Sequence, residues 1–582
     1  MSGSRVTQQR SQVKALAAWG ALAFGGAGVF ALATNAADEP VEQRAQKAAA
    51  AKVVSIDGAE IFAREWIPGD ARSHGGDGLG PVFNDSSCVA CHNQGGVGGG
   101  GPASKNVDIV TAFHAPVNQQ QRGGNSVRVP TTLPGLVFQS VFGQLDNVPV
   151  QQAADAAAED QADPAGDPKE QLAGAERAAE QRKKQAELQK KLMEADRKRL
   201  AKLHPGFAFA NSVVLHKDAT YGGYQTWRSQ VGGMQFGGFQ QAAQVQMFVS
   251  DGADVVGTEA VASNPSNGAL LMNQLKQEVQ FGSNRGNNTS MRQGSFVVTK
   301  SQRNTTALFG AGLIDSISEE TLVALEEAQS KNPLISGRVA RLKDGSPGRF
   351  GWKAQKSSLG DFVLTACAVE VGLNVPEHPQ AGLPQDLNYK PAGLDLNQDQ
   401  CNALIGYIAG LPAPAQRKFG DDTDRNYIHG GQALFAKAGC ADCHVEKVGE
   451  VAGIFSDLLL HDMGPELGDT GSYDVFIPDS TPEGELLLTG DPDQQKKLTG
   501  ATRQEWRTTP LWGVRDSAPY LHDGRAATLA QAIAMHGGEA QTSTQKFFAL
   551  SDAERFQVIS FMKSLIAPTQ EAEKTRKVAS AR

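Results

Sequence analysis

Two short stretches of the sequence place cysteine and histidine at the same spacing. Both read Cys-x-x-Cys-His, and their reactive residues are Cys88, Cys91, His92, Cys440, Cys443 and His444. Two thiols three residues apart, on one helical turn, can add to the two vinyl groups of a haem, and the histidine that follows then faces the iron. The spacing therefore predicts two covalently bound haem c groups, with His92 and His444 as proximal ligands.

Zinc and redox chemistry are the alternatives for such cysteine pairs. A zinc site would need further cysteine or histidine ligands at matching spacing, and a thioredoxin-like pair would not carry a histidine at this position twice. The remaining two of the six cysteines, Cys367 and Cys401, lie 34 residues apart in predicted helices. We expect them to form a disulfide, and two separate buried thiols are the alternative.

The composition is that of a soluble globular protein of several domains. Of 582 residues, 40% are hydrophobic and 20% are charged, which is ordinary for a folded chain. The net charge of −8 argues against nucleic acid as a partner, because phosphate binding needs a basic surface. The acidic charge is compatible with a basic redox partner.

The N-terminal segment carries the features of an export signal. Arg5, Arg10 and Lys14 precede an uncharged run over residues 15–34. A basic start, an apolar stretch and a small-residue exit are typical of a cleaved signal, and about 20 apolar residues also suffice for a membrane anchor. We expect residues 1–37 to be a signal or an anchor and the protein to be periplasmic, where c-type haem is attached. The membrane is a partner only if this segment is retained.

The rest of the chain divides into two haem-bearing blocks. Each opens on the pattern Gly-x-x-Ile/Leu-Phe, at Gly58 and at Gly431. Helices are expected at 318–330 and 397–409, and strands at 246–249 and 296–299. The expected divisions are a linker (38–54), an N-terminal haem domain with a β-containing region (55–415), a charged helical insertion within it (150–204), a C-terminal haem domain (416–566) and a tail (567–582).

Several longer strings resemble one known family. They are residues 80–84 (GPVFN), 303–310 (RNTTALFG), 348–354 (GRFGWKA), 456–464 (SDLLLHDMG), 505–513 (EWRTTPLWG) and 521–526 (LHDGRA). Together they resemble the bacterial di-haem c-type oxidoreductases described as peroxidases or "thiol oxidoreductases", which are similar to di-haem cytochrome c peroxidases, MauG enzymes and rubber oxygenases. The resemblance covers residues 55–150 and 205–566. It implies a mainly α fold of two cytochrome-c-like haem domains with β-containing excursions.

The resemblance also implies a second axial ligand for the C-terminal haem. In the wider superfamily this ligand lies eight residues after the threonine that begins a late helix, which here leads from Thr528 to His536. Met535 is an alternative, but adjacent helical residues point about 100° apart, so only one of the two can meet the iron. His461 and Met463 remain open as further alternatives.

The N-terminal haem is less determined by the sequence. Its nearest other histidines, His74 and His114, stand at no spacing that dictates ligation, and we expect both to be structural. His522 is likewise expected to make a loop hydrogen bond. The resemblance implies that the N-terminal iron is the reacting one, and no distal acid or base is identified. Trp352 is either an electron carrier between the haems or a packed core residue.

The leading functional hypothesis is a peroxidase-like oxidoreductase. Hydrogen peroxide would be reduced at the N-terminal haem, with electrons relayed by the C-terminal haem from a small redox protein or a quinol-linked donor. Peroxide-driven oxidation of another protein is a variant of this hypothesis. The alternatives are an oxygenase that uses dioxygen, an electron-transfer cytochrome, and a protein whose helical insertion docks a partner.

Overall fold

The computed structural model describes residues 56–114, single positions between 180 and 195, and residues 197–208, 210–233, 268–282, 289–293, 296–384, 386, 389–471, 476–477 and 499–568. The chain divides into two units, residues 1–55 and 56–582, and all the described residues belong to the second. The predicted signal or anchor, the linker, the strand at 246–249, most of the insertion and most of the tail therefore lie outside the described residues.

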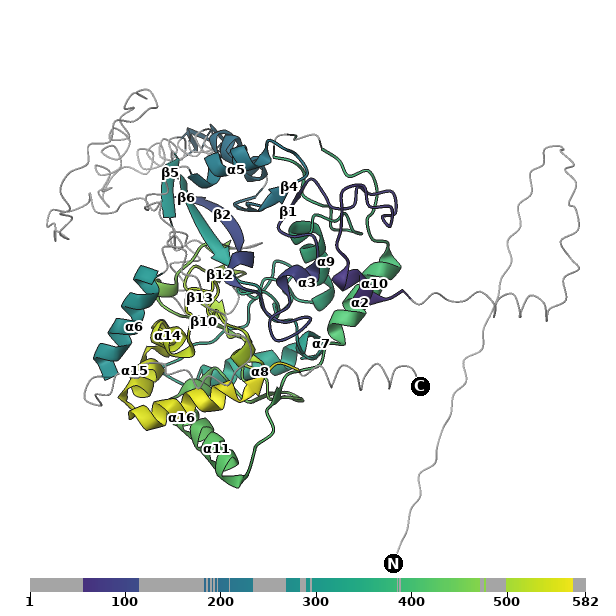
Figure 1. The fold of residues 1–582 in the computed structure, drawn as a ribbon. Helices are drawn as coiled ribbons and strands as arrows, with labels where there is room; N and C mark the ends of the chain where they lie inside the picture. Colours follow the sequence, from purple (N-terminus) through teal and green to yellow (C-terminus); the bar gives the residue numbers. More distant parts are fainter. Residues whose placement is uncertain are drawn as a thin grey trace, which may run out of the picture. The chain divides into compact units, whose positions relative to one another are not determined.

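The repeated Gly-x-x-Ile/Leu-Phe pattern marks the same helix crossing in both blocks (Figure 1). In the first block, α2 (Gly58–Ala63) contacts α10 (Gln398–Ala409), and a Cβ on Gly58 would lie 2.0 Å from the carbonyl oxygen of Ala403. In the second, α11 (Asp422–Lys437) contacts α16 (Asp552–Lys563), and a Cβ on Gly431 would lie 2.2 Å from the carbonyl oxygen of Gln557. Glycine is needed at both positions because the partner backbone occupies the space of a side chain.

One turn further on, each crossing is closed by an aromatic pair. The ring of Phe62 lies 5.5 Å from that of Tyr407, and the ring of Phe435 lies 5.5 Å from that of Phe561. Each phenylalanine stands four residues after its glycine, which places both on one helix face. The pattern noted in the sequence is thus a structural repeat, and it positions an aromatic ring beside each Cys-x-x-Cys-His motif.

The two helices expected most clearly from the sequence are both present. Ser318 caps α8 (Glu319–Gln329), and Asn397 begins α10 with a reciprocal capping box to Gln400. Further helices of the described residues include α3 (Cys88–Cys91), α5 (Tyr224–Gly233), α6 (Gly268–Gly282), α7 (Ala311–Asp315), α9 (Leu359–Glu370), α14 (Leu529–Ala534) and α15 (Gln541–Ala549). Short 3₁₀ turns lie at Ala103–Lys105, Pro205–Ala208, Cys440–Asp442, Pro465–Leu467, Val514–Asp516 and Gly538–Ala540.

A four-stranded antiparallel sheet forms the β-containing excursion. Its strand order is β3 (Ser212–Val214), β2 (Val107–His114), β6 (Phe296–Arg303) and β5 (Thr289–Gln293), and β6 contains the strand predicted at 296–299. The register pairs Val107 with Arg303, so the start of β2 and the end of β6 lie together. Both of these residues line a cavity beside the first motif, so the sheet delivers side chains to that site.

The other strands form two-residue or three-residue pairs that hold loops in place. The most important is β10 (Leu460–Asp462) with β13 (Glu505–Arg507), whose register sets His461 opposite Trp506 and Leu460 opposite Arg507. The remaining pairs are β1 (Val82–Phe83) with β4 (Asp218–Ala219), β7 (Ala415–Gln416) with β14 (Leu565–Ile566), β8 (Lys447–Val448) with β9 (Val451–Ala452), and β11 (Phe476–Ile477) with β12 (Ala501–Thr502).

The hydrophobic cores cross the boundary expected at residue 415. The first core contains Phe62 and Leu404 from the N-terminal block, and also Ile454, Leu458 and Trp512 from the C-terminal block. The second core is built mainly on the contact between α11 and α16. The described part of the chain is rich in helices, as expected, and its strands belong to the sheet and the short pairs. Among the helices of the described residues, none is both long and apolar enough to cross a bilayer.

The glycine at the second helix crossing should be intolerant of even one added methyl group. We expect Gly431→Ala to lower the free energy of unfolding by about 2 kcal/mol, because overpacking forces the two helices apart. Gly406→Ala is the control, since Gly406 is exposed on α10 and no atom lies within 4 Å of an added Cβ. That control should be neutral or slightly stabilising. Equal losses for the two variants in denaturant unfolding would contradict this account.

Candidate functional site

The first Cys-x-x-Cys-His motif opens onto a cavity of about 160 Å³. Ser87 caps the short helix α3 by accepting a hydrogen bond from the Ala90 amide, 3.3 Å away, and so fixes the turn that carries both cysteines. Cys88, Cys91 and His92 all line the cavity. The motif residues are therefore brought together on one wall, as the spacing predicts.

The ring of His92 is held as a neutral imidazole. Its Nδ1 donates to the carbonyl oxygen of Gly99, 3.1 Å away, on the glycine-rich loop that turns back after the motif. Burial lowers the pKa of His92 to about 4. With the proton on Nδ1, Nε2 keeps a lone pair, which is the form that ligates a metal. The ring of Phe62 lies 6.3 Å away and limits its rotation.

No second histidine and no methionine line this first cavity among the described residues. His74 instead forms a backbone bridge with Leu394, and the side chain of His114 lies outside the described residues. Helix α9 supplies one wall of the cavity, ending at Glu370. The Glu370 carboxylate accepts a hydrogen bond of 2.6 Å from Asn84, which also lines the cavity. Sequence reasoning identified no acid or base here. The structure places two carboxylates on the lining, those of Asp85 and Glu370, and Asp85 is paired with Lys105.

The second motif opens onto a larger cavity of about 290 Å³. Here His444 donates from Nδ1 to the carbonyl oxygen of Phe455, 2.9 Å away, and burial lowers the pKa of His444 to about 4. The ring of Phe435 lies 6.2 Å from the His444 ring. The two motif histidines thus share one arrangement: a neutral ring, a backbone carbonyl on Nδ1 and a phenylalanine alongside.

His536 is a second histidine that lines this cavity. It follows α14, which begins at a capping box between Thr528 and Gln531. Its Nδ1 donates to the carbonyl oxygen of Ala532, 2.7 Å away, which leaves a lone pair on Nε2, and burial lowers its pKa. The neighbouring Met535 is buried in a cluster with Leu467 and is not among the residues that line the cavity.

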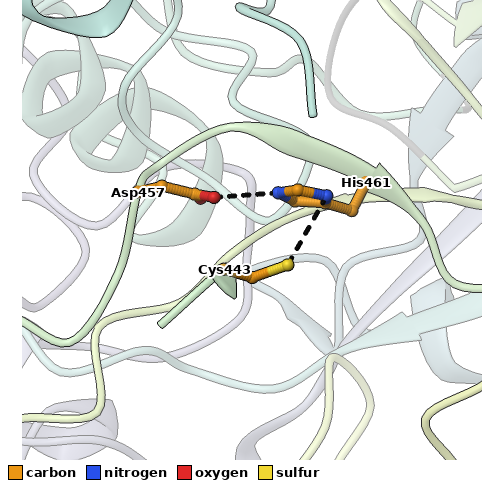
Figure 2. A group of neighbouring side chains, drawn as sticks. All are labelled: Cys443, Asp457 and His461. Carbon is orange, nitrogen blue, oxygen red and sulfur yellow. Dashed lines mark hydrogen bonds and ion pairs between the residues drawn. The ribbon is translucent and has the colours of Figure 1, made fainter. Parts of the chain in front are cut away.

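His461 lines the same cavity, but both of its ring nitrogens are engaged. Nε2 contacts Asp457 (Figure 2) at a distance of 2.9 Å, and Nδ1 lies 2.8 Å from Glu539. Burial alone would lower the pKa of His461, but Asp457 and the other negative groups outweigh it and raise this pKa well above 6.5. A protonated ring with two carboxylate partners has no free lone pair, so His461 is poorly suited to ligate iron.

Cys443, Asp457 and His461 form a cluster with the composition of a metal site (Figure 2). The Cys443 sulfur lies 3.7 Å from Nδ1 of His461. Cys443 is also a motif cysteine, however, and a sulfur in a thioether carries no negative charge to offer a metal ion. The cluster is better described as a buried ion network beside the second motif.

The last two candidates from the sequence, His522 and Met463, also lie on the lining of this cavity. The ring of His522 stacks on that of Trp506 with centroids 3.9 Å apart, and its Nε2 lies 3.3 Å from Asp469. Met463 lines the cavity beside Leu467. The loop role expected for His522 agrees with these contacts.

The two cavities share a wall. Asn304, Thr305, Gly351 and Trp352 belong to the lining of both. The indole Nε1 of Trp352 donates to the carbonyl oxygen of Asn304, 2.9 Å away, which fixes the ring in this wall. Trp352 therefore lines both motif sites, and it also packs against the buried cluster that contains Trp506 and Met535.

Cys367 and Cys401 are free thiols in the structure. Both are buried in the first core, on α9 and α10, where they pack as small apolar residues. The disulfide expected from the sequence is not formed, and the alternative of two separate buried thiols describes the structure. Cys367 also contributes to the lining of the first cavity.

The cavities fit the cofactor that the motifs predict. Each combines two cysteines, a neutral histidine with its proton on Nδ1, and a lining dominated by apolar and aromatic side chains. The second cavity also contains Arg507, a buried guanidinium whose Nη1 has no hydrogen-bond partner among the described residues. An anionic apolar macrocycle suits such a cavity.

Comparison with known proteins agrees with this description. Residues 275–565, half of the chain, match the family described as "Di-haem oxidoreductase, putative peroxidase". The chain belongs to this di-haem oxidoreductase family. The matched segment includes the second motif, the shared wall and α14, whereas the first motif precedes it.

The chain is also similar to individual known proteins. It is 31% identical over 144 residues to the methylamine utilization protein MauG of Methylorubrum extorquens, a match that covers 24% of this chain and about a third of that relative. Hydrazine synthase of Kuenenia stuttgartiensis aligns with 20% identity, a TM-score of 0.25, and 46% and 73% of the two chains. A MauG-like protein associated with microbial copper homeostasis aligns with 19% identity, a TM-score of 0.22, and 43% and 90% of the two chains.

Breaking the ion network at His461 should be costly. We expect His461→Gln to lower the free energy of unfolding by about 3 kcal/mol at pH 6, because Asp457 and Glu539 would remain buried without their cation. Since the pKa of His461 is raised, its contribution is complete below pH 6.5 and is lost as the pH rises through the folded-state value. Denaturant unfolding should show that the wild type and His461→Gln differ less in their free energy of unfolding at pH 10 than at pH 6.

His378→Gln is the matched control for this experiment. His378 also pairs with a carboxylate, at 2.8 Å from Asp361, but that pair is partly exposed. Its loss should cost less than about 1 kcal/mol. A loss at His461 no larger than that at His378 would contradict the description of a buried network.

Proposed function

We propose that this di-haem oxidoreductase is a periplasmic peroxidase-like enzyme that reduces hydrogen peroxide at the N-terminal site, with the C-terminal site relaying electrons from an external donor. One observation carries the proposal: the two cavities differ in the potential ligands that they offer besides the motif histidine. Beside His444 the lining contains His536, whereas beside His92 it contains no further histidine or methionine among the described residues. A haem bound by each motif would supply an iron that exchanges single electrons and, where a position is open, binds a small oxidant.

Reduction of peroxide to two water molecules consumes two electrons and two protons. Two one-electron sites within one chain meet the first requirement. Glu370 is our candidate for the second, because its carboxylate lines the N-terminal cavity and is oriented by Asn84. His92 stays oriented through its bond to Gly99.

Trp352 is our candidate for the electron path between the sites. It lines both cavities, and its indole is fixed by the hydrogen bond to Asn304. A related proposal, which rests on the resemblance of the sequence motifs to MauG enzymes, is that peroxide drives the oxidation of another protein. The electron donor is proposed to be a small redox protein or a quinol-linked protein, and export rests on the signal-like N-terminal sequence.

The assignment of His536 as the second ligand of the C-terminal haem has a direct spectroscopic test. We expect the oxidised protein to give one high-spin and one low-spin signal in low-temperature electron paramagnetic resonance. His536→Ala should convert the low-spin signal to high spin, because the iron loses its sixth ligand. Met535→Leu, at the adjacent buried position, is the control and should leave both signals in place. The opposite pattern would assign the ligand to Met535.

Reaction with peroxide tests the proposed activity itself. In stopped-flow mixing, the half-reduced protein should respond to micromolar peroxide in its haem spectrum. Glu370→Gln should slow this reaction by about 10²-fold, the usual scale of a lost proton-transfer group. Asp361→Asn, on the same helix but outside the cavity lining, should react at the normal rate.

The competing functions predict other results in the same experiments. A protein that shows no response to peroxide and binds neither cyanide nor carbon monoxide at either haem is an electron-transfer cytochrome. A stable oxygenated spectrum in the isolated protein would instead favour an oxygenase. Either result would overturn the peroxidase proposal.

A further inference from the structure

Arg507 is the last residue of β13 and lies where the two cavities meet. Its backbone amide donates to the carbonyl oxygen of Trp352, 3.0 Å away, and its Nε donates to the carbonyl oxygen of Gly351, 2.9 Å away. Gly351 and Trp352 line both cavities, and Arg507 itself lines the C-terminal one. Two hydrogen bonds to backbone carbonyls thus fix the main chain and the guanidinium of Arg507 at the shared wall.

The guanidinium of Arg507 is buried without a matching anion. The residue is 7% exposed, and its Nη1 has no hydrogen-bond partner among the described residues. Other buried arginines of the described chain are paired: Arg303 makes two hydrogen bonds to Asp469, and Arg338 makes two to Glu505. An unpaired buried charge costs several kcal/mol, so this arrangement calls for an anion in the cavity.

The chain's own carboxylates near Arg507 are already engaged. Asp457 acts on Arg507 electrostatically, but its oxygens accept hydrogen bonds from His461, Gln329 and the Leu459 amide. Glu539, on the same cavity lining, is bound to His461 and Ser336. No carboxylate of the described residues hydrogen-bonds to the Arg507 guanidinium, which points to an anion supplied by a bound group.

We infer that Arg507 binds a carboxylate of the haem held by Cys440, Cys443 and His444, at the wall that faces the N-terminal site. A haem carries two propionate carboxylates, and a planar guanidinium with a free N–H edge matches a carboxylate in shape and charge. This inference rests on the haem being bound at the second motif. It does not depend on peroxide being the oxidant.

The contact has a consequence for the reduction of the C-terminal haem. A fixed cation beside the propionate favours the reduced iron, which carries one positive charge less than the oxidised iron. At about 10 Å and an effective dielectric constant of about 20, removing that cation should lower the equilibrium constant for reduction about tenfold. For a one-electron couple this corresponds to a midpoint potential about 59 mV lower.

The experiment uses the holoprotein with both haems attached. The midpoint potential of the C-terminal haem is measured by spectroelectrochemical titration, and its propionate bending bands are followed by resonance Raman spectroscopy. Arg507→Met should lower the midpoint potential of the C-terminal haem by about 59 mV and shift one of the propionate bending bands. Arg507→Lys should keep most of the potential, because the charge remains, and still shift the band, because the planar N–H edge is lost.

Arg349→Met is the matched control. Arg349 is another partly buried arginine that donates only to backbone carbonyls, those of Ile317, Pro347 and Ser357, and it lines neither cavity. The loss of one positive charge at Arg349 should leave both the midpoint potential and the propionate band unchanged. An unchanged propionate band in Arg507→Met would overturn the inference, and so would an equal change in potential in Arg349→Met. If Arg507→Met does not retain haem, an unchanged band in Arg507→Lys overturns it.

These outcomes separate this inference from the proposed function. A protein that fails to reduce peroxide can still show the potential and Raman shifts, because neither readout involves the oxidant. Conversely, an active peroxidase in which Arg507 variants leave both readouts unchanged would retain the proposed function and refute the role of Arg507.

Discussion

The hydrogen bond from Nδ1 of each motif histidine to a backbone carbonyl is the constraint around which the described structure is organised. It fixes the tautomer, so that Nε2 offers its lone pair to the cavity at both His92 and His444. To supply that carbonyl, the chain must turn back on itself after each motif. The glycine-rich loop that ends at Gly101 does this in the first block, and the segment that contains Phe455 does it in the second.

Two similar scaffolds nevertheless carry different sites. The helix crossing at a glycine and the phenylalanine beside the histidine are the same in both blocks. The difference lies in what is added around each cavity. The first receives α9, which brings the carboxylate of Glu370, and the second receives the segment after α14, which brings His536. The first cavity has no histidine or methionine besides His92 among the described residues, whereas the second offers the neutral His536 as well as His444, and the proposed function rests on this difference.

The wall between the cavities is held by buried charge as well as by packing. Trp506 lies between the ring of His522 and the Nζ of Lys353, which is 3.7 Å from the indole centroid. Lys353 in turn donates to three backbone carbonyls around β13, including that of Glu505 at 2.6 Å. A polar framework in this wall is thus formed by Lys353, the paired Arg303 and the unpaired Arg507. This framework orients Trp352, and the guanidinium of Arg507 is left to bind an anion.

The haem chemistry could be predicted from the sequence, because covalent attachment of haem requires a fixed local spacing that can be read without a fold. Cys88, Cys91, His92 and their counterparts Cys440, Cys443 and His444 were identified in this way, as were the helices expected at 318–330 and 397–409. The glycine and phenylalanine of the repeated pattern were also visible, because they recur at one spacing on one helix face.

Tertiary structure alone decided which distant residues meet these motifs. Glu370 stands 278 positions after His92, and Arg507 lies 63 positions after His444, so no local pattern links either one to its cavity. The state of Cys367 and Cys401 depended likewise on how α9 and α10 pack. The sequence favoured His536 over His461 as the ligand only through a family resemblance, and no local pattern showed the contacts of His461, His522 or His536. The fold distinguishes them by giving the first two charged or stacked partners and leaving the third a free lone pair.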